Sequence, residues 1–358
     1  MNHRVIQWST GNAGLRSLRI VLRHPEFELV GLHAHSPEKL GKDAAEIAGE
    51  GGAPTGVIAT GDADALLSLG ADCVIYTVQG ETRPFEVVDE LCQILESGTN
   101  VVSTSIVSLV YPPFAHPKLR EPLEAACKKG GSTLFTSGID PGFSGDLLPL
   151  AMLSLSDRVD SVRCTELMNY ATYPDPDFTG EHFGFARPLS YEPPLLRPGA
   201  LRWGWGGMVQ MLADALEIGL DEIRESHDRK VSDVAFECAM GKVEPGMVDA
   251  VRFSLEGIVN GRVVVAAEHV NRLRDEAAPD WPSPAPGRGS GYRVEIEGSP
   301  TMRCDFELRG PDGDNNTAGI TATAARVINA IPAVVAAPPG MVSTLDLPHT
   351  PPRGWVAH

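Results

Sequence analysis

A glycine turn near the N-terminus, VIQWSTGNAG at residues 5–14, limits the fold of this chain more than any other feature. An apolar run leads into the turn, apolar side chains recur at helical spacing over residues 15–22, and a second apolar run follows at 29–32. Strand, glycine turn, helix and strand in this order place a dinucleotide pyrophosphate at a helix N-terminus, where N–H groups and the helix dipole favour negative charge. The sequence therefore predicts a dinucleotide-binding domain.

The turn departs from the full G-x-G-x-x-G pattern because Ser9 occupies the first glycine position, while Gly11 and Gly14 occupy the second and third. Gly11 lets the backbone approach the pyrophosphate, and Gly14 allows the helix to pack closely on the strand. A plain tight turn is the alternative interpretation, but the flanking strand and helix favour nucleotide binding. The residues expected to contact the cofactor here are Ser9, Thr10, Gly11, Asn12, Ala13 and Gly14.

The end of the second apolar run, HAHSPEK at residues 33–39, indicates which cofactor binds. NAD sites usually place a carboxylate at this strand end, whereas NADP sites avoid it and supply hydrogen-bond donors or cations. This strand end has no acid; Ser36 can donate a hydrogen bond, Lys39 can reach a phosphate, and His35 lies between the strand and these two. Alternatively, Ser36 is a helix N-cap with Pro37 at the first helical position, and Lys39 is solvated. We expect NADP(H), with NAD(H) as the alternative.

Composition excludes several classes of protein. The net charge of −17 over 358 residues argues against nucleic acid or anionic membrane as a partner, since both attract basic surfaces. The six cysteines lie far apart without a C-x-x-C pair, which favours reduced thiols over disulfides or a zinc site, and no metal is expected. The N-terminus enters a strand at once, unlike a signal peptide. Residues 318–337 are apolar but contain Arg326, Asn329 and Pro332, unlike a membrane span. We expect a soluble cytoplasmic protein with a small-molecule substrate.

Apolar runs alternate with helical segments through the first half of the chain. The runs lie at residues 71–77, 100–104 and 133–136, with helix-like stretches at 84–96 and 119–129. This alternation predicts an α/β fold of the Rossmann type, with a doubly wound parallel sheet whose ligands lie beyond the C-terminal strand ends. Those ends add Thr77, Val78, Gln79, Ser103, Thr104 and Gly138 to the expected cofactor contacts.

After residue 150 the pattern changes to strict alternation of apolar and polar residues. Residues 251–256 alternate, Asn260-Gly261 is a strong hairpin turn, and residues 292–297 alternate again. This pattern predicts an antiparallel or mixed sheet with one polar face and a helix near 209–218. We expect a first domain at 1–145, an α+β domain at 146–316, and a C-terminal helix and tail at 317–358 that return to the first domain.

Five motifs carry a family resemblance: QWSTGNAG (7–14), HSPEKLGKD (35–43), NVVST (100–104), GIDPGF (138–143) and RVINAIP (326–332). In this order the chain resembles oxidoreductases with a dihydrodipicolinate-reductase-type N-terminal domain, and within them the 2,4-diaminopentanoate dehydrogenase and native amine dehydrogenase group. The resemblance implies NAD(P)-dependent hydride transfer involving a small-to-medium ketone, imine or amine. It also implies a substrate cleft between the domains and a homodimer built partly on the second domain's sheet. The last motif adds Asn329 to the expected cofactor contacts.

One departure from the family concerns proton transfer. The amine dehydrogenases have a glutamate shortly after the strand that matches residues 100–104, whereas this chain reads SIVSLVYP at 105–112, with Val107 or Ser108 at the corresponding position. The nearest substitute is Asp140, although an aspartate before Pro-Gly is also a common turn former. Tyr111 either donates a proton or packs beside the cofactor. Asp140 and Tyr111 are therefore the expected catalytic residues.

The substrate is expected to contact Val107, Ser108, Asn169, Tyr173 and Trp203. Glu166, on the same alternating strand as Asn169, either lines the substrate site or faces solvent, and the second interpretation is preferred. His182 is a weaker candidate for the site, since lone histidines in loops are mostly solvated. The tryptophans of the WGWGG segment at 203–207 form either an apolar lid or packing at an interface. Two other functions stay open: a nucleotide-binding protein without turnover, in a sensor or assembly role, and a carbonyl reductase that does not use ammonia.

Overall fold

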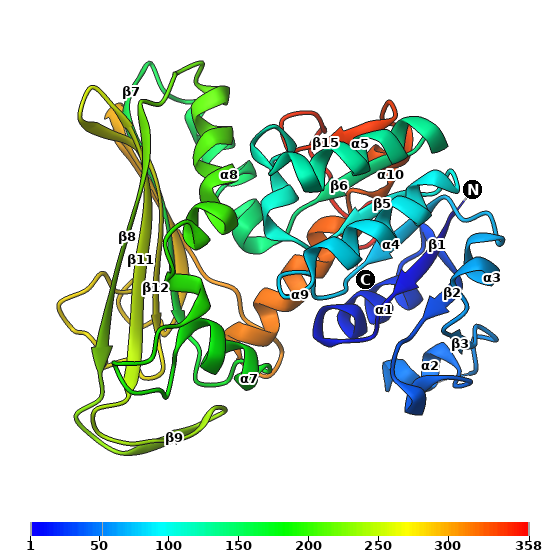
Figure 1. Ribbon diagram of the computed structural model, residues 1–358, viewed down its shortest axis with the longest axis horizontal. Helices are drawn as coiled ribbons and strands as arrows, with labels where there is room; N and C mark the ends of the chain where they lie inside the picture. The colour runs from blue at the N-terminus through cyan, green and yellow to red at the C-terminus, as the bar shows by residue number, and fades with distance from the viewer. Residues whose placement is uncertain (1, 52, 357–358) are drawn as a thin grey trace. The chain divides into compact units, whose positions relative to one another are not determined.

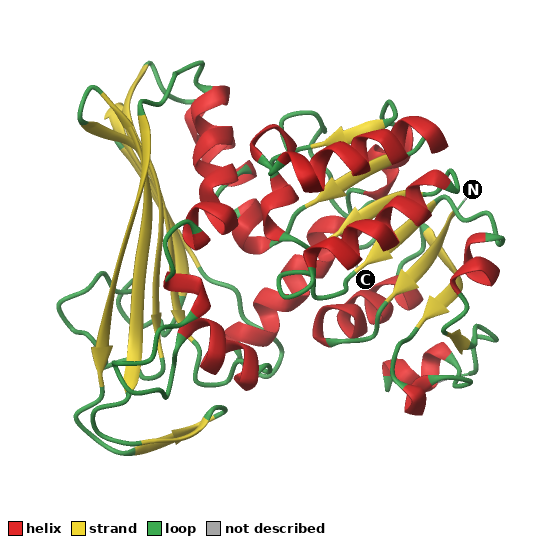
Figure 2. Ribbon diagram, in the orientation of Figure 1, coloured by secondary structure: helices red, strands yellow, loops and turns green. Residues whose placement is uncertain are grey.

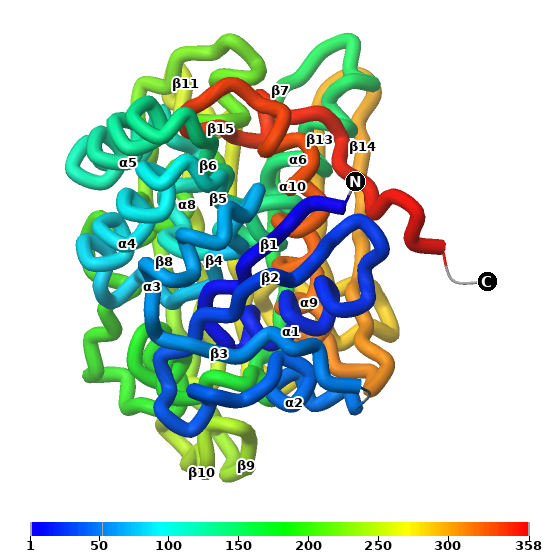
Figure 3. Tube along the Cα trace, turned by 90° about the vertical axis from the view of Figure 1, so that its right-hand side faces the viewer, coloured from blue at the N-terminus to red at the C-terminus, as the bar shows by residue number. Residues whose placement is uncertain are grey.

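The computed structural model describes residues 2–51 and 53–356. The chain forms two units: unit 1 comprises Met1–Ile139 and Ile320–His358, and unit 2 comprises Asp140–Gly319 (Figure 1). The first division falls after Ile139 rather than at 145, so Asp140 is the first residue of unit 2. The C-terminal segment belongs to unit 1, where its last strand lies beside a strand of the N-terminal region (Figure 3).

In the described part of unit 1, seven strands form a parallel sheet with the order β15-β6-β5-β4-β1-β2-β3. The strands are β1 (His3–Trp8), β2 (Phe27–His33), β3 (Ala59–Thr60), β4 (Cys73–Tyr76), β5 (Asn100–Ser103), β6 (Thr133–Thr136) and β15 (Gly340–Val342). The predicted doubly wound parallel sheet is thereby confirmed. Strand order reverses between β1 and β4, which is where such sheets bind their ligands.

Helices cover both faces of this sheet (Figure 2). They are α1 (Asn12–Arg23), α2 (Ala44–Ala48), α3 (Ala63–Leu67), α4 (Pro84–Glu96), α5 (Pro117–Gly130), α9 (Asn315–Ile328), which enters unit 1 at Ile320, and α10 (Ile331–Ala336). Val21 of α1 shares one apolar core with Val327 of α9 and Val334 of α10. The helices α4 and α5 pack side by side (Figure 1).

The segment Asn315–Ala336 is long and apolar enough to cross a membrane by composition alone. In the structure, its apolar side chains pack in the core of unit 1, where Val327, Ile328 and Ile331 are fully buried against the sheet. The guanidinium of Arg326 is bound by the Thr344 and Thr350 hydroxyls at 3.1 Å. Packing within the domain accounts for the apolar character of this segment.

Unit 2 is built on a mixed sheet, whose six strands among the described residues have the order β14-β13-β7-β12-β11-β8. The strands are β7 (Arg158–Asn169), β8 (Glu222–Val231), β11 (Val248–Val259), β12 (Arg262–Arg272), β13 (Gly291–Ser299) and β14 (Met302–Phe306). The predicted Asn260-Gly261 hairpin joins β11 to β12 and both residues have positive φ, 49° and 75°. All pairs are antiparallel except β12 with β7, which are parallel.

The remaining elements of unit 2 flank this sheet. They are α6 (Leu147–Leu153), α7 (Pro176–Phe178), α8 (Ala200–Ala215) and the small hairpin β9 (Phe236–Cys238) and β10 (Gly241–Val243). The helix predicted at 209–218 begins at Ala200, so the WGWGG segment belongs to it. Its glycines disfavour a helix locally, but packing of Trp205 on Phe253 and of Val209 beside Gly257 of β11 overrides that preference.

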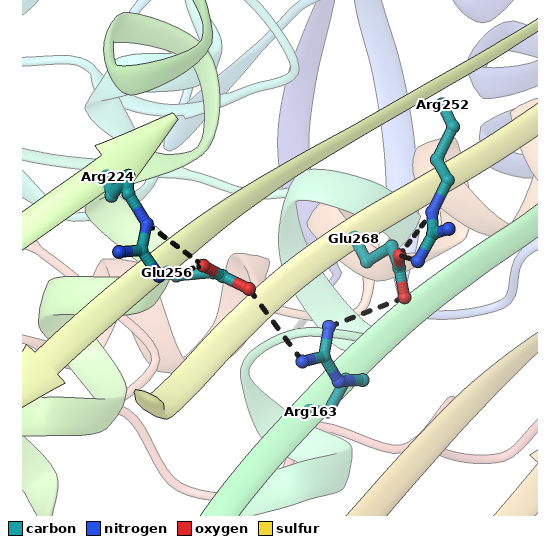
Figure 4. Close-up of polar contacts among 5 residues, drawn as sticks. All are labelled: Arg163, Arg224, Arg252, Glu256 and Glu268. Atoms are coloured by element: carbon teal, nitrogen blue, oxygen red, sulfur yellow. Dashed lines mark hydrogen bonds and ion pairs between the residues drawn. The ribbon is translucent and has the colours of Figure 1, made fainter. Parts of the chain in front are cut away.

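The face of the sheet opposite α8, called the outer face below, is charged. Figure 4 shows an alternating row across it in the order Arg224, Glu256, Arg163, Glu268, Arg252. Glu268, 3% exposed, binds Arg252 at 2.5 Å and Arg163 at 3.4 Å, and Glu256 binds Arg224 at 2.8 Å. The predicted polar face is confirmed, although its charges are paired with one another and partly buried.

Candidate active site

The glycine turn after β1 is fixed by side chains of the sheet. Ser9 has φ 83°, and Gln7 Nε2 donates to the Ser9 carbonyl oxygen and to Thr77 Oγ1, both at 2.9 Å. A Cβ on Gly14 would lie 2.3 Å from the Ser9 carbonyl oxygen, so only glycine lets α1 pack this closely. A Cβ on Gly11 would meet only Ser9 Oγ, at 3.9 Å. The fold thus has room for a side chain at Gly11, and a bound pyrophosphate would compete for that space.

A lysine ammonium and the N-terminus of a helix lie beside this turn. The ammonium of Lys39 donates to the Thr10 carbonyl oxygen at 2.8 Å. The helix α1 begins next to it at exposed Asn12, and the first N–H groups of a helix have no partner within the helix. Both features favour an anionic ligand at this position.

The end of β2 offers no carboxylate. Its last residue, His33, stacks on Trp8 at 4.2 Å between ring centroids, and burial lowers the pKa of His33 to about 4, so this ring is neutral at pH 7. Ser36 precedes the short helical turn Pro37–Lys39 as its N-cap, as one interpretation predicted, yet its hydroxyl makes no capping hydrogen bond. His35 is exposed beside it.

The other expected cofactor contacts follow strands that end at one edge of the sheet. Trp8 pairs with Tyr76, Tyr76 with Ser103, and Ser103 with Thr136, so the ends of β1, β4, β5 and β6 are in register. The expected residues at or directly after these ends are Thr77, Val78, Gln79, Ser103, Thr104 and Gly138. Asn329 has different surroundings: it lines a cavity of about 240 Å³ with residues of α10 and the segment 348–353. Its contact with the cofactor stays a prediction.

Buried polar atoms at this edge have no partner among the described residues. They include the hydroxyls of Ser108, Thr136 and Ser137. A buried hydroxyl without a hydrogen bond costs about 1–3 kcal/mol, and such groups call for a partner such as a bound ligand. The residues at the strand ends therefore fit a dinucleotide that carries polar groups along its length.

The segment that follows β5 contains the position of the family glutamate. Residues Val107–Val110 form a short helical turn in which Ser108 is 4% exposed. Ser105 Oγ donates to the Val78 carbonyl oxygen, which ties this segment to the end of β4. Tyr111 is also buried. The roles expected for Val107, Ser108 and Tyr111 stay predictions.

Unit 2 contains a buried chain of ionisable side chains that begins at Asp140. Its Oδ1 accepts from Trp205 Nε1 at 2.8 Å and lies 3.2 Å from His269 Nε2. His269 Nδ1 in turn lies 3.2 Å from Glu166 Oε1, which accepts from the Tyr170 hydroxyl at 2.9 Å. The side chains of Asp140, His269 and Glu166 are only 4%, 4% and 6% exposed.

Charge pairing governs protonation in this chain. Burial by itself lowers the pKa of His269, but Asp140 and Glu166 outweigh burial and raise it to about 10. Burial by itself raises the pKa of Asp140, but the His269 imidazolium and the hydrogen bonds from His269, Ser144 and Trp205 hold it below its ordinary value. Burial, followed by the charge of Glu166, raises the pKa of Tyr170 well above its ordinary value. At pH 7 the chain thus holds an imidazolium and an ionised Asp140.

These contacts revise two expectations. Asp140 is not a turn former bonded to nearby backbone; its oxygens are held by Ser144, Trp205 and His269. Its lowered pKa keeps Asp140 ionised at pH 7, and its catalytic role stays a prediction. The interpretation of Glu166 as solvent-facing is wrong, because it is 5% exposed and bonded within the sheet.

Sequence reasoning missed His269 entirely. The residue lies among buried positions of β12, directly opposite Glu166 on β7. An ionisable residue among buried positions was the available signal, but its partner is 103 positions away in the chain. That separation cannot be read from local sequence pattern.

The residues expected to contact the substrate in unit 2 differ in their surroundings. Asn169 is bound to Asp275 through Nδ2 at 2.7 Å and accepts from the Ala171 N–H at 2.9 Å, and its contact with the substrate stays a prediction. Tyr173 packs on Tyr170 at 5.0 Å between ring centroids. Trp203 is partly exposed on α8. The described residues contain no cluster of histidine, cysteine or acidic side chains suited to a metal ion.

Comparison with known proteins identifies the family. Residues 202–356 match the family model of the 2,4-diaminopentanoate dehydrogenase C-terminal domain. The chain is 39% identical over 351 residues to an amine dehydrogenase from Streptomyces virginiae, covering 98% of this chain and 97% of that protein. The chain belongs to the amine dehydrogenase family. As a member, it is an NAD(P)-dependent oxidoreductase that uses a nicotinamide cofactor.

More distant relatives agree with this assignment. A 2,4-diaminopentanoate dehydrogenase from Acetoanaerobium sticklandii is 25% identical over 288 residues, which is 80% of this chain and 76% of that protein. The structure of an amine dehydrogenase from Mycobacterium smegmatis superposes with a TM-score of 0.78 at 24% identity, covering 99% of this chain and 98% of that one. The fold expected from the resemblance is confirmed over the whole length.

Proposed function

We propose that this amine dehydrogenase family member transfers hydride between NADP(H) and a small-to-medium ketone, imine or amine, by reductive amination or its reverse. The observation that carries the proposal is the 39% identity, over nearly the whole chain, to a protein named amine dehydrogenase. The aromatic side chains around Tyr170 in unit 2 suit an apolar substrate.

The preference for NADP(H) over NAD(H) is supported by charge. The end of β2 has no carboxylate to bind the ribose hydroxyls of NAD, and the ammonium of Lys39 lies beside the glycine turn. Ser36 adds a hydroxyl without a capping bond. These groups are suited to the extra phosphate of NADP.

When bound, the nicotinamide supplies or accepts the hydride. The residues of this protein would have other tasks: the N-terminus of α1 and Gly11 would hold the pyrophosphate, and the strand ends would orient the rest of the cofactor. Forming an imine from ammonia and a ketone also needs a group that gives and takes protons near pH 7. Residues 105–112 provide no carboxylate for this step, so the proton must be handled elsewhere in the protein.

The decisive experiment follows NADPH oxidation with a panel of apolar ketones, with and without ammonium chloride, and NADP⁺ reduction with the matching amines. Ammonium-dependent oxidation of NADPH that yields the amine supports the proposal. Oxidation that is indifferent to ammonium would make the protein a carbonyl reductase. Binding of NADPH without turnover of any ketone or amine would leave a nucleotide-binding protein and refute the proposal.

The cofactor preference is tested with Lys39→Ala. Because a charge-assisted hydrogen bond is worth about 1.5–3 kcal/mol, the Kd of NADPH should rise about 10- to 100-fold while that of NADH changes little. Lys42→Ala is the matched control, since Lys42 is a nearby lysine already paired with Glu46 at 3.1 Å. Equal losses for both cofactors, or tighter binding of NADH by the wild type, would overturn the preference.

We also propose a cytoplasmic homodimer that binds neither nucleic acid nor membrane. The net charge of −17 and the six free cysteines support the cytoplasmic part. The charged outer face of the unit 2 sheet contains a cavity of about 490 Å³ lined by polar strands, a surface that a second copy can cover. Light scattering at low and high salt tests the dimer, and a monomer at both would exclude it.

A further inference from the structure

The buried chain of unit 2 leads from Asp140 to a tyrosine that lies at its far end. We propose that Tyr170 exchanges protons with the substrate, and that His269, held between Asp140 and Glu166, is the positioning residue that keeps a proton available to it. This inference rests on the function proposed above and supplies the proton-handling group that residues 105–112 lack. The chain comprises contacts of 3.2 Å (Asp140 to His269), 3.2 Å (His269 to Glu166) and 2.9 Å (Glu166 to Tyr170).

The strands fix the position of each member. His269 on β12 is directly opposite Glu166 on β7, and Glu166 is opposite Tyr292 on β13, so the three lie in one row across the sheet. The His269 ring stacks on Phe253 at 4.5 Å and meets the edge of Trp205 at 4.8 Å between ring centroids. With both nitrogens bound and both neighbours aromatic, the imidazole has one orientation.

Removing these charged side chains from water costs free energy of folding, which suggests that the charges have a function. Two carboxylates and a histidine at 6% exposure or less are removed from water, and buried ion pairs seldom stabilise a fold more than apolar residues of the same size. Perturbed ionisable groups of this kind concentrate at functional sites. A purely structural role is the competing explanation that the experiment below separates.

Tyr170 is the last member of this chain of ionisable side chains. Part of the residue is exposed, whereas its hydroxyl is buried beside Glu166; its ring packs against Tyr173, Phe183 and Phe185 at 5.0, 5.7 and 6.1 Å between centroids. Its hydroxyl is therefore a polar group within an apolar, aromatic surrounding. Sites for small apolar molecules combine these two features.

The other titratable groups that interact with members of this chain are Cys164, Tyr292 and Tyr173. Burial raises the pKa of the Cys164 thiol and that of the Tyr292 hydroxyl well above their ordinary values, so both are neutral at pH 7. The protons that move within the chain are thus those of His269 and Tyr170.

The proton balance of the amination step follows from the contacts. As the hydroxyl of the ammonia adduct of the ketone leaves, it takes the proton of the Tyr170 hydroxyl and departs as water. The Nδ1 proton of His269 passes to Glu166 Oε1, and Glu166 returns a proton to the Tyr170 oxygen. The imidazole is then neutral, and one proton from solvent restores it. Overall the reaction consumes that proton, one ammonia, one ketone and one NADPH, and releases amine, NADP⁺ and water.

The test compares Tyr170→Phe with Tyr191→Phe, a control phenol in the same unit whose hydroxyl donates to the Glu181 carbonyl oxygen at 3.1 Å, outside the chain. Since acid/base assistance contributes about 10²- to 10⁴-fold, Tyr170→Phe should lower kcat for ketone amination by at least about 100-fold with the Kd of NADPH unchanged. Tyr191→Phe should keep the wild-type kcat.

A structural role is separated by the pH profile and by NMR. In the wild type, ¹⁵N spectra should show one imidazole doubly protonated at pH 8, a signal absent from His269→Gln. His269→Gln should also shift the pH dependence of kcat, while Glu166→Gln provides a second variant if the first does not fold. Wild-type kcat in Tyr170→Phe, or a neutral His269 at pH 8, would overturn the inference and leave the proposed function intact. Absence of turnover in the wild type would instead refute the proposed function and this inference with it.

Discussion

The charge on His269 should make the stability of unit 2 depend on alkaline pH. The pKa of His269 is raised from 6.5 to about 10 in the folded protein, and each pH unit of difference between folded and unfolded states is worth about 1.4 kcal/mol. Because the folded pKa is the higher one, this stabilisation is fully present below pH 6.5 and is lost as pH rises through about 10. Between pH 6.5 and 9.5 the wild type should lose roughly 3 kcal/mol through this group.

The assay is urea unfolding at both pH values, followed by tryptophan emission, for the wild type and His269→Gln. At pH 6.5 the variant should be about 3–5 kcal/mol less stable, because Asp140 and Glu166 then lose their buried cation. At pH 9.5 this difference should shrink by the roughly 3 kcal/mol that the wild type loses. Groups outside this cluster titrate alike in both proteins, so the change of the difference with pH reports on His269 and the carboxylates paired with it. A gap between the two proteins that stays constant with pH would show that His269 is not charged in the fold.

Two further predictions concern unit 1. Gly14→Ala should lower the melting temperature and abolish NADPH binding, since its Cβ would lie 2.3 Å from the Ser9 carbonyl oxygen. Gly11→Val should fold normally and lose only the cofactor. Thermal scans and fluorescence titration check both variants, and retained NADPH binding by either would contradict the assignment of the turn. Ser108→Glu puts a carboxylate near the position of the family glutamate and should raise ammonium-dependent turnover. It should also lower stability, because the new charge would be buried. An unchanged rate of turnover would show that this position does not reach the substrate.

The elements of unit 1 could be predicted from the sequence because each is locally specified. Its central strands are continuous apolar runs, as parallel strands buried on both faces require. The strands β3 and β15 were missed because they have two and three residues and carry no pattern of their own. Their positions are set by neighbouring strands.

Unit 2 was less predictable for a physical reason. The strand β8 reads EIRESHDRKV, and most of its side chains are exposed or charged because it is an edge strand. Charged edges prevent pairing with other molecules, and they also remove the apolar signal by which a strand is predicted. The glycines of α8 have the opposite effect on prediction. They favour a loop, whereas packing on the sheet enforces a helix.

The candidate site was also only partly predictable from the sequence. The glycine turn and the uncharged end of β2 are contiguous in sequence, so their function could be argued from residue order. Asp140, Trp205 and His269 come from three separate segments, 64 positions or more apart, and only the folded sheet brings them into contact.

The location of the proton bears on how this protein manages without the family glutamate. A single carboxylate that gives and takes protons must have its pKa tuned close to the working pH, since it is otherwise in the wrong state for one half of the reaction. A histidine between two carboxylates meets the requirement differently, because the paired charges hold a proton on His269 across the neutral range. The apolar segment at 105–112 is then no obstacle to acid/base chemistry. The proton is stored in the second unit, among charges that the sheet holds in place, and reaches the substrate through Tyr170.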